Sequence, residues 1–367
     1  MPFADELVGA DVARDLARVF EGATGAPPHA VRAAAARLGP LGLRQRCDLL
    51  RDALLADVPG DTAALLAAVR ATRTSPGFAG WLVWPVTEAV VSRAVAEGTG
   101  TAFDAALDSL AELTPLLSSE FALRGLLEQD LHRALGRIRE WTASPDEHVR
   151  RLASEGTRPY LPWAKRVRAL LAEPTATVPI IDALHGDTSD YVRRSAANHL
   201  NDLSRDHPEL VVQTAARWLG EPGEHTSRVV RHGLRTLVKQ GHPEALALLC
   251  YSPAPQVRVG ELALDAGSVA IGGALEFRST LVNTGAEPVA LAVDYLVHHR
   301  KANGGRTAKT FKLTTRTLEP GGTWELAKRH SFREITTRRY HPGGHAVELQ
   351  VNGVVRARAE FTLTAAR

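Results

Sequence analysis

The feature that most constrains the fold of this chain is a change of hydrophobic period near residue 255. Before it, alanine, leucine, arginine and valine recur at three- and four-residue spacing between proline or glycine breaks, which is the pattern of amphipathic helices. After Pro253 and Pro255, apolar and polar residues alternate between turn sequences such as NTGAEP and EPGG, as in an all-β sandwich. We therefore expect a helical domain over residues 1–254 and a β domain over residues 255–367.

The helical region repeats itself loosely. The segment PDEHVRRLASEG at 145–156 is echoed by TSDYVRRSAANHLNDL at 188–203 and by TSRVVRHGLRTLVKQ at 226–240. A period of roughly 35 to 43 residues with two helices per unit indicates HEAT-like repeats, in which each helix pair buries its apolar face against its neighbours. The predicted fold is multidomain, α then β: a HEAT-like α-helical repeat solenoid followed by an Ig-like β-sandwich.

Basic charge is concentrated near the carboxyl end of the chain. Although the net charge is only +3, residues 268–367 hold 15 lysines and arginines against 8 aspartates and glutamates. Concentrated basic charge is the electrostatic footprint of a protein that binds a polyanion, and the plainer interpretation is that it keeps the domain soluble.

The sequence argues against a metal site, a nucleotide-hydrolysing site and a membrane span. Cys47 and Cys250 lie far apart and outside any C-x-x-C pattern, and no phosphate-binding glycine loop or H-E-x-x-H helix is present. The amino-terminal segment lacks the basic and apolar regions of a signal peptide, and no apolar run is long enough to span a bilayer. We expect no cofactor and a cytoplasmic protein of a bacterial-type cytosol or nucleoid.

A polar face on the helix after Ser189 is the first candidate site. Arg194, Asn198 and Asp202 follow at four-residue spacing beside the apolar stripe, so their side chains share one face of the helix. Such a ladder either caps neighbouring loops, as is common in helical repeats, or presents charged groups to a substrate.

Three further residues have both a structural and a functional interpretation. Glu155 follows Arg151 by four positions and could be its surface ion-pair partner. Glu120 follows two serines that could cap a helix, where the helix dipole favours a carboxylate. Trp163, in the proline-stiffened stretch GTRPYLPWAKR, lies among cations as a nucleic-acid contact would, although tryptophans more often belong to a core.

Arginines recur at equivalent positions of the repeats. Arg150 and Arg151 correspond to Arg193 and Arg194, and more loosely to Arg231 and Arg235. Repeated arginines along one groove would follow a phosphate backbone, whereas the alternative is a solvated helix face.

These segments together resemble a known family. The runs SSEFALRGLLEQD, PDEHVRRLASEGTRPYLPWAKR, DYVRRSAANHLNDLSRDHPEL and VRHGLRTLVKQGHPEALALL resemble the AlkC branch of the AlkD-like HEAT-repeat DNA alkylation-repair glycosylases. GFAGWLVWPVTEAV and TTRRYHPGGHAVELQVNG are similar to further parts of that family, so the resemblance extends over nearly the whole chain.

The resemblance implies an activity and a site. It implies a monofunctional glycosylase that hydrolyses the N-glycosidic bond of cationic N-alkylated bases, such as 3-methyladenine, in duplex DNA. Placed on matching positions of this sequence, the catalytic residues would be Glu120, Trp163, Asp202 and Glu155. Their carboxylates would stabilise the oxocarbenium-like sugar, and the indole would offer its π face to a cation.

The resemblance further implies that the base is not flipped out of the duplex. The sequence shows no aromatic-lined nucleobase pocket that would argue otherwise, and selectivity would then depend on how readily a cationic base leaves. Neutral lesions such as uracil should be poor substrates. Since no lysine is an obvious Schiff-base nucleophile, we expect base release without strand cleavage.

For DNA binding, we expect the concave groove of the repeats to contact the duplex through Arg150, Arg151, Arg158, Lys165, Arg166, Arg193, Arg194, Asn198 and Arg231. Arg338, Arg339 and His341, before a Gly-Gly turn of the β domain, should bind the same DNA. We expect a monomer without an obligate protein partner.

Two other functions are compatible with parts of the sequence. A non-catalytic HEAT-repeat scaffold that binds DNA or protein would use the same helices and give the glutamate, tryptophan and aspartate structural roles. A nucleosidase that acts on free nucleosides would leave the basic β domain without a purpose.

Overall fold

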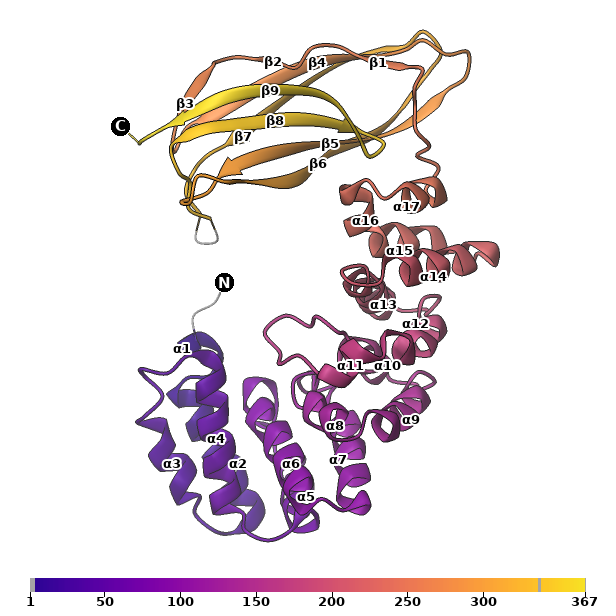
Figure 1. The fold of residues 1–367 in the computed structure, drawn as a ribbon. Helices are drawn as coiled ribbons and strands as arrows, with labels where there is room; N and C mark the ends of the chain where they lie inside the picture. The colour runs from indigo at the N-terminus through magenta and orange to yellow at the C-terminus, as the bar shows by residue number, and fades with distance from the viewer. Residues whose placement is uncertain (1–3, 336–337, 367) are drawn as a thin grey trace. The chain divides into compact units, whose positions relative to one another are not determined.

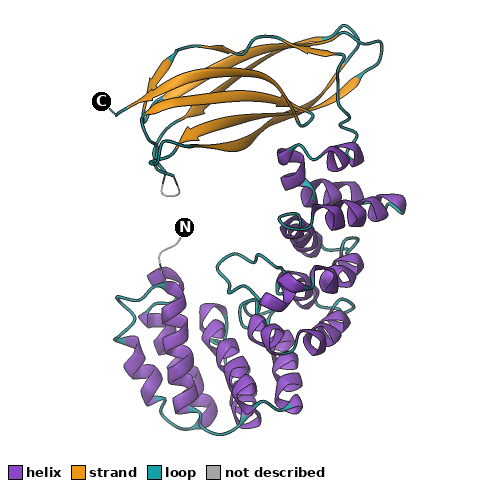
Figure 2. Ribbon diagram, in the orientation of Figure 1, coloured by secondary structure: helices purple, strands orange, loops and turns teal. Residues whose placement is uncertain are grey.

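The chain divides into two compact units, Met1–Gly233 and Leu234–Arg367. The computed structural model describes residues 4–335 and 338–366. Figure 2 shows that helices build the first unit and that the second consists mainly of strands. Within the described residues, no helix is both long and apolar enough to cross a membrane.

Short helices joined by tight turns make up the first unit. Its α-helices and 3-10 helices (η) are α1 (Ala4–Leu7), α2 (Ala10–Thr24), α3 (His29–Ala35), α4 (Leu43–Asp57), α5 (Thr62–Thr72), η1 (Gly80–Leu82), α6 (Val83–Glu97), α7 (Gly100–Leu113), α8 (Leu123–Gln129), α9 (Leu131–Trp141), α10 (Glu147–Glu155), α11 (Arg168–Ala172), η2 (Pro174–Thr177), α12 (Val178–Leu184), α13 (Asp190–Leu203), α14 (Pro208–Gly220) and α15 (Thr226–Gly233). Asp130 caps α9 by accepting a hydrogen bond from the Arg133 N–H at 3.0 Å, and Gly98 ends α6 in the left-handed conformation.

The helices follow one another along the unit in chain order, as the colours in Figure 1 show, and each packs on helices close to it in the sequence. Helices α4, α6 and α8 contact one another in turn, as do α10, α13 and α15, while α2, α5, α7, α9 and α12 form a second row of neighbours. Fully buried leucines such as Leu16, Leu107 and Leu200 fill the space between these rows. Each pair therefore buries its apolar face against its neighbours, and the predicted HEAT-like repeat fold is confirmed.

Two packed sheets make up most of the second unit. Its strands are β1 (Val257–Val259), β2 (Ala263–Leu264), β3 (Ser268–Ala270), β4 (Ala274–Asn283), β5 (Val289–Arg300), β6 (Arg306–Leu318), β7 (Thr323–Ser331), β8 (Gly343–Val351) and β9 (Val354–Thr364). In one sheet β4 pairs with β1, β2 and β7, and the other has the order β3-β9-β8-β5-β6. Phe277 and Tyr295, from opposite sheets, belong to one shared core, which confirms the predicted Ig-like sandwich.

The last two helices, α16 (Arg235–Gln240) and α17 (Pro243–Leu248), belong to the second unit. Leu246 and Tyr251 pack against Ala292 of β5. A Cβ atom on Gly241 would lie only 2.6 Å from the carbonyl oxygen of Gly353, so the two backbones touch. The change from helix to strand near residue 255 therefore does not coincide with the division between the compact units.

Candidate active site

Glu120 lies in the turn between α7 and α8. Its Oε2 accepts hydrogen bonds from the Ser118 hydroxyl at 2.7 Å and from Arg151 Nη1 at 2.5 Å, and no described residue donates to its Oε1. Neither preceding serine caps α8, because Ser118 bonds to Glu120 itself and Ser119 donates to the carbonyl of Leu110 at 3.0 Å. Helix capping therefore does not explain Glu120, and one of its carboxylate oxygens has no hydrogen-bond donor among the described residues.

Two arginines link Glu120 to the other carboxylates that the sequence singled out. Arg151 on α10 also has its Nη2 3.5 Å from Glu155 Oε1. Arg158 donates from Nη1 to Glu155 Oε1 at 2.5 Å, and from Nε and Nη2 to the two oxygens of Asp202 at 2.8 and 3.1 Å. We call this chain of alternating charges, Glu120–Arg151–Glu155–Arg158–Asp202, the charge ladder.

The inner part of the charge ladder is buried. The side chains of Glu155, Arg158 and Asp202 are only 7, 9 and 10% exposed. Burial raises the pKa of Asp202, whereas the hydrogen bonds and charge of Arg158 oppose that rise. Each buried ion thus depends on its partner for compensation of its lost hydration.

Helix α13 supports the ladder through residues that the sequence analysis missed. The Ser195 hydroxyl donates to Glu155 Oε2 at 2.7 Å, and its spacing of seven residues from Asp202 could have placed it on the same helix face. His199 is fully buried, donates from Nδ1 to the carbonyl of Ser154 at 2.9 Å and lies with Nε2 3.0 Å from the Thr177 hydroxyl. Burial lowers the pKa of His199 to about 4, so this histidine is neutral.

Another missed residue, Arg124 on α8, anchors the loop that follows α10. Its Nη1 donates to the carbonyls of Gly156 and Arg158 at 3.3 and 2.9 Å, and its Nε donates to the carbonyl of Lys165. Arg124 is 3% exposed, and burial lowers its pKa to about 10, which leaves it charged at neutral pH. The loop 156–167 is thus held near both of its ends.

Trp163 projects from this loop. Its backbone is left-handed, with φ 65°, and its side chain is among the most exposed of the large apolar ones, at 62%. Together with Glu120, Arg151 and Glu155 it lines a pocket of about 370 Å³. The structure therefore brings Trp163, Glu120 and Glu155 to one pocket, whereas Asp202 joins them through Arg158 and does not line it.

The same pocket corrects one expectation. The sequence alone shows no aromatic-lined nucleobase pocket, yet in the structure Trp81 and Phe121 line this pocket beside Trp163. The ring of Phe121 also packs on Trp84, with centroids 4.9 Å apart. Phe121 directly follows Glu120, and Trp81 belongs to the family-like segment GFAGWLVWPVTEAV, but only the fold shows that these aromatic residues meet.

The described residues include no group of three or more His, Cys, Asp or Glu side chains arranged to hold a metal ion.

Residues 118–235 match the family model of the DNA alkylation repair enzymes, and residues 258–365 match that of the C-terminal Ig-like domain of the uncharacterised protein YhaZ. The uncharacterized protein YhaZ of Bacillus subtilis is 36% identical over 259 residues, which cover 71% of this chain and 72% of YhaZ. The structure of Pseudomonas fluorescens alkylpurine DNA glycosylase AlkC, bound to DNA containing an abasic site analog, matches with a TM-score of 0.89 and 34% identity over 99% of this chain and 100% of that one. The chain belongs to the AlkC-type family of DNA alkylation repair proteins.

In this AlkC-type protein, three of the arginines expected on DNA are instead engaged within the fold. Arg150 binds both oxygens of Asp187 at 2.7 and 3.0 Å, and Arg193, 5% exposed, donates to the carbonyls of Asp187 and Thr188. Arg158 belongs to the charge ladder. Arg150 fastens α10 to the loop before α13, Arg193 ties α13 to the same loop, and Arg158 binds Asp202, so the geometry gives each guanidinium a structural role.

The other predicted DNA contacts of the first unit differ in their exposure. Lys165, Arg166, Arg194 and Arg231 are exposed. Arg194 pairs with Asp190 at 3.0 Å, and Asn198 Oδ1 lies 2.9 Å from His232 Nε2. Arg151 belongs to the charge ladder and also lies over the ring of Tyr191, 5.1 Å from its centroid.

The basic residues expected in the β domain of this AlkC-type protein lie close together. Arg338, Arg339 and His341 line a pocket of about 210 Å³ that Lys301 and Lys309 also line. Arg338 Nη1 is 2.6 Å from Nε2 of His299, and burial, together with the charge of Arg338, lowers the pKa of His299 to about 3. A neutral His299 can accept the hydrogen bond from Arg338 and leave the positive charge on the arginine.

Proposed function

We propose that this AlkC-type DNA repair glycosylase is a monofunctional enzyme that hydrolyses the N-glycosidic bond of cationic N-alkylated bases, of the 3-methyladenine type, in duplex DNA. The observation that carries the proposal is that Glu120, whose Oε1 accepts no hydrogen bond from any described residue, and Trp163 line one pocket. The match to an alkylpurine glycosylase over nearly the full length of both chains supports the same substrate class.

The chemistry needs a negative site rather than an acid. A 3-alkylpurine already carries a positive charge, so its departure requires no proton, and the barrier lies in the oxocarbenium-like sugar that remains. The charge ladder contains three carboxylates and two guanidinium groups and is therefore negative overall. A fixed negative group at the pocket stabilises that sugar as its charge develops, which lowers the barrier without reorganisation of solvent.

The members of the ladder have different parts in this proposal. Glu120, with a free oxygen at the pocket, faces the sugar and orients the attacking water. Glu155 and Asp202 hold Arg151 and Arg158 in place and contribute to the negative potential. The exposed indole of Trp163 offers its π face to the cationic sugar or base, a contact worth about 0.5 to 2 kcal/mol.

We propose that the lesion stays in the base stack and that the enzyme acts without a cofactor, as a monomer with no obligate protein partner. An extruded base would have to be held between two ring faces, but of the three aromatic residues that line the pocket, Trp81 and Phe121 already pack on Trp84, which leaves Trp163 as the exposed ring. A fluorescent 2-aminopurine placed beside the lesion tests this step, because extrusion of the neighbouring base would raise its emission on binding. A large rise in emission would contradict the proposal.

We also propose that the DNA strand is left intact. Cleavage by a bifunctional glycosylase requires an amine that attacks the sugar, and no lysine lines the pocket of Glu120 and Trp163. The expected product is an abasic site, which a denaturing gel distinguishes from a broken strand.

The decisive experiment compares Glu120→Gln with the wild-type protein on methylated duplex DNA, with detection of the free alkylbase. Removal of the charge should lower single-turnover base release by about 10²- to 10³-fold, the usual effect of losing one preorganised electrostatic contact. Binding to DNA with an abasic-site analogue should persist, because the amide keeps the shape of the side chain. The matched control is Glu140→Gln on α9, where the side chain is 65% exposed.

Release of alkylbase at the wild-type rate by Glu120→Gln would contradict the assignment of Glu120. Asp202→Asn should also lose activity, through the altered Arg158, while binding is retained. If the wild-type protein binds DNA but releases no alkylbase, the non-catalytic scaffold is the better description.

A further inference from the structure

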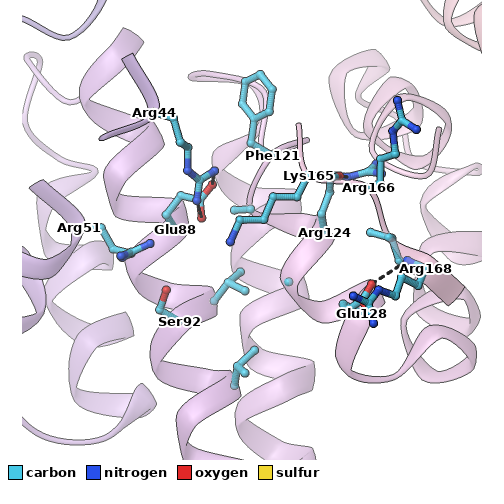
Figure 3. A pocket seen from close by; sticks show the side chains of 15 residues that line it. Arg44, Arg51, Glu88, Ser92, Phe121, Arg124, Glu128, Lys165, Arg166 and Arg168 are labelled. Carbon is cyan, nitrogen blue, oxygen red and sulfur yellow. Dashed lines mark hydrogen bonds and ion pairs between the residues drawn. The ribbon is translucent and has the colours of Figure 1, made fainter. Parts of the chain in front are cut away.

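A second pocket of the first unit shares Phe121 with the pocket of Glu120. It has a volume of about 470 Å³ and lies between α4, α6, α8 and residues 165–168 (Figure 3). A Cβ atom on Gly125 would lie 2.7 Å from Cγ1 of Val91, so α8 packs directly on α6 at the floor of the pocket. We call it the α4–α8 pocket.

Cationic side chains dominate its lining. They are Arg44, Arg51, Arg124, Lys165, Arg166 and Arg168, against the carboxylates of Glu88 and Glu128. On the α4 side the charges are balanced, since Arg44 binds Glu88 through two hydrogen bonds at 2.8 and 3.0 Å and Arg51 pairs with Asp48 and Asp52. The positive excess therefore comes from α8 and from residues 165–168.

That excess is not compensated within the described part of the chain. Neither the ammonium of Lys165 nor the guanidinium of Arg168 has an ion-pair partner there, and Glu128 accepts only the backbone N–H of Arg168 at 2.9 Å. Arg124, almost fully buried, has an Nη2 with no hydrogen-bond partner. Figure 3 shows the Lys165 side chain extending across the pocket toward the α6 side.

We propose that the α4–α8 pocket binds one backbone phosphate of the DNA duplex, next to the sugar that faces Glu120. The inference rests on the proposed function for its ligand, a DNA duplex, and adds a phosphate site to which Arg124, Lys165 and Arg168 contribute. Its volume is in the range of sites that take small ligands, and a phosphodiester is the anion that a DNA-binding protein meets at highest local concentration.

The geometry gives this phosphate a function in positioning. Lys165 and Trp163 are two residues apart on one loop, and Arg124 anchors that loop through the carbonyl of Lys165. A phosphate held by Lys165 and Arg168 therefore fixes the strand relative to Trp163 and Glu120. Removing the positive charges of the pocket should weaken DNA binding. It should therefore slow base release more at subsaturating DNA concentrations than at saturating ones.

The test compares Lys165→Gln/Arg168→Gln with a control of equal charge change, Arg70→Gln/Arg139→Gln, on the exposed faces of α5 and α9. Binding is measured as a function of salt on a duplex that carries a tetrahydrofuran abasic-site analogue. Each phosphate neutralised contributes about 0.9 to the magnitude of the slope of log affinity against log salt concentration. This slope should therefore be smaller by about 0.9 in the pocket variant and unchanged in the control.

A second arm identifies the phosphate. Single methylphosphonate groups, which are uncharged, are placed at successive positions on either side of the analogue. One position should weaken wild-type binding by about the same factor as the pocket variant and have no further effect on that variant. If no methylphosphonate position behaves in this way, the proposal is overturned. If, in addition, millimolar inorganic phosphate at constant ionic strength displaces the DNA, the pocket takes free phosphate and not a phosphate of the duplex.

The outcome is separable from that of the proposed function, because binding to the analogue requires no chemistry. If the effects of the methylphosphonate and of the pocket variant are coupled but the protein releases no alkylbase, the phosphate site stands and the proposed enzymatic activity is rejected. If the protein releases alkylbase but the two effects are independent, only the phosphate site is rejected.

Discussion

Replacement of Arg158 by glutamine should destabilise the first unit by about 3 to 5 kcal/mol near neutral pH, the usual cost of removing one partner from a buried ion pair. Arg158 makes three charge-assisted hydrogen bonds to Glu155 and Asp202, and all three side chains are at most 10% exposed. The amide of glutamine cannot replace them, so two carboxylates would lose their main compensation for burial.

The loss should depend on pH in a defined direction. Burial already raises the pKa of Asp202 in the wild-type protein, so the folded state binds this proton more tightly than the unfolded chain. Its contribution to stability is therefore greatest below the ordinary aspartate pKa and falls as the pH rises through the raised value. Without Arg158 the pKa rises further, so the destabilisation should shrink on acidification by up to about 1.4 kcal/mol per pH unit for each proton bound.

The assay is urea unfolding followed by the helical circular dichroism signal at about pH 7.5 and about pH 5. Arg139→Gln, on the exposed face of α9, is the control and should change stability by less than about 0.5 kcal/mol. Adding Asp202→Asn to Arg158→Gln should restore part of the loss, because one uncompensated charge is removed. Equal losses at the two pH values, or no recovery in the double variant, would refute the reasoning.

Three further results are expected. Trp163→Ala should slow base release by about 2- to 30-fold, the rate equivalent of a cation–π contact, without loss of stability because the ring is 62% exposed; an unchanged single-turnover rate would exclude the contact. Arg338→Gln/Arg339→Gln should reduce the salt slope of duplex binding by up to about 1.8, and an unchanged slope would remove the β domain from the DNA interface. Duplexes that contain uracil should release no base above background, since a neutral leaving group gains little from a negative site; measurable uracil release would contradict the mechanism.

The fold was predictable because its signals are local. The three- and four-residue periodicity and the later alternation of apolar residues each reflect a single helix or strand, and both interpretations are confirmed. The assignment of α16 and α17 to the second unit was not predictable. It reflects contacts such as those of Gly241 with Gly353 and of Leu246 with Ala292, whose residues lie far apart in the sequence.

The site was only partly predictable, for a related reason. Glu120, Glu155 and Asp202 each had an adequate local explanation, and the ladder that joins them depends on Arg158 reaching across 44 positions to Asp202. Arg158 and Arg193 were expected to contact DNA because the sequence of a helical repeat does not distinguish a buried arginine from a solvent-exposed one. Burial and backbone acceptors, which distinguish them, appear only in the folded chain.

The contact between α17 and the sheet decides where this protein can be divided for separate study. A fragment that starts at residue 255 would uncover Ala292 of β5 and remove one of the two carbonyl acceptors of the Asn352 amide, that of Ser252, while the carbonyl of Ala290 remains. Such a fragment would expose an apolar surface that favours aggregation and would hold Asn352 by one hydrogen bond fewer. A fragment that starts at Leu234 keeps α16 and α17 packed on the sheet and should be the shortest piece of the second unit that stays monodisperse.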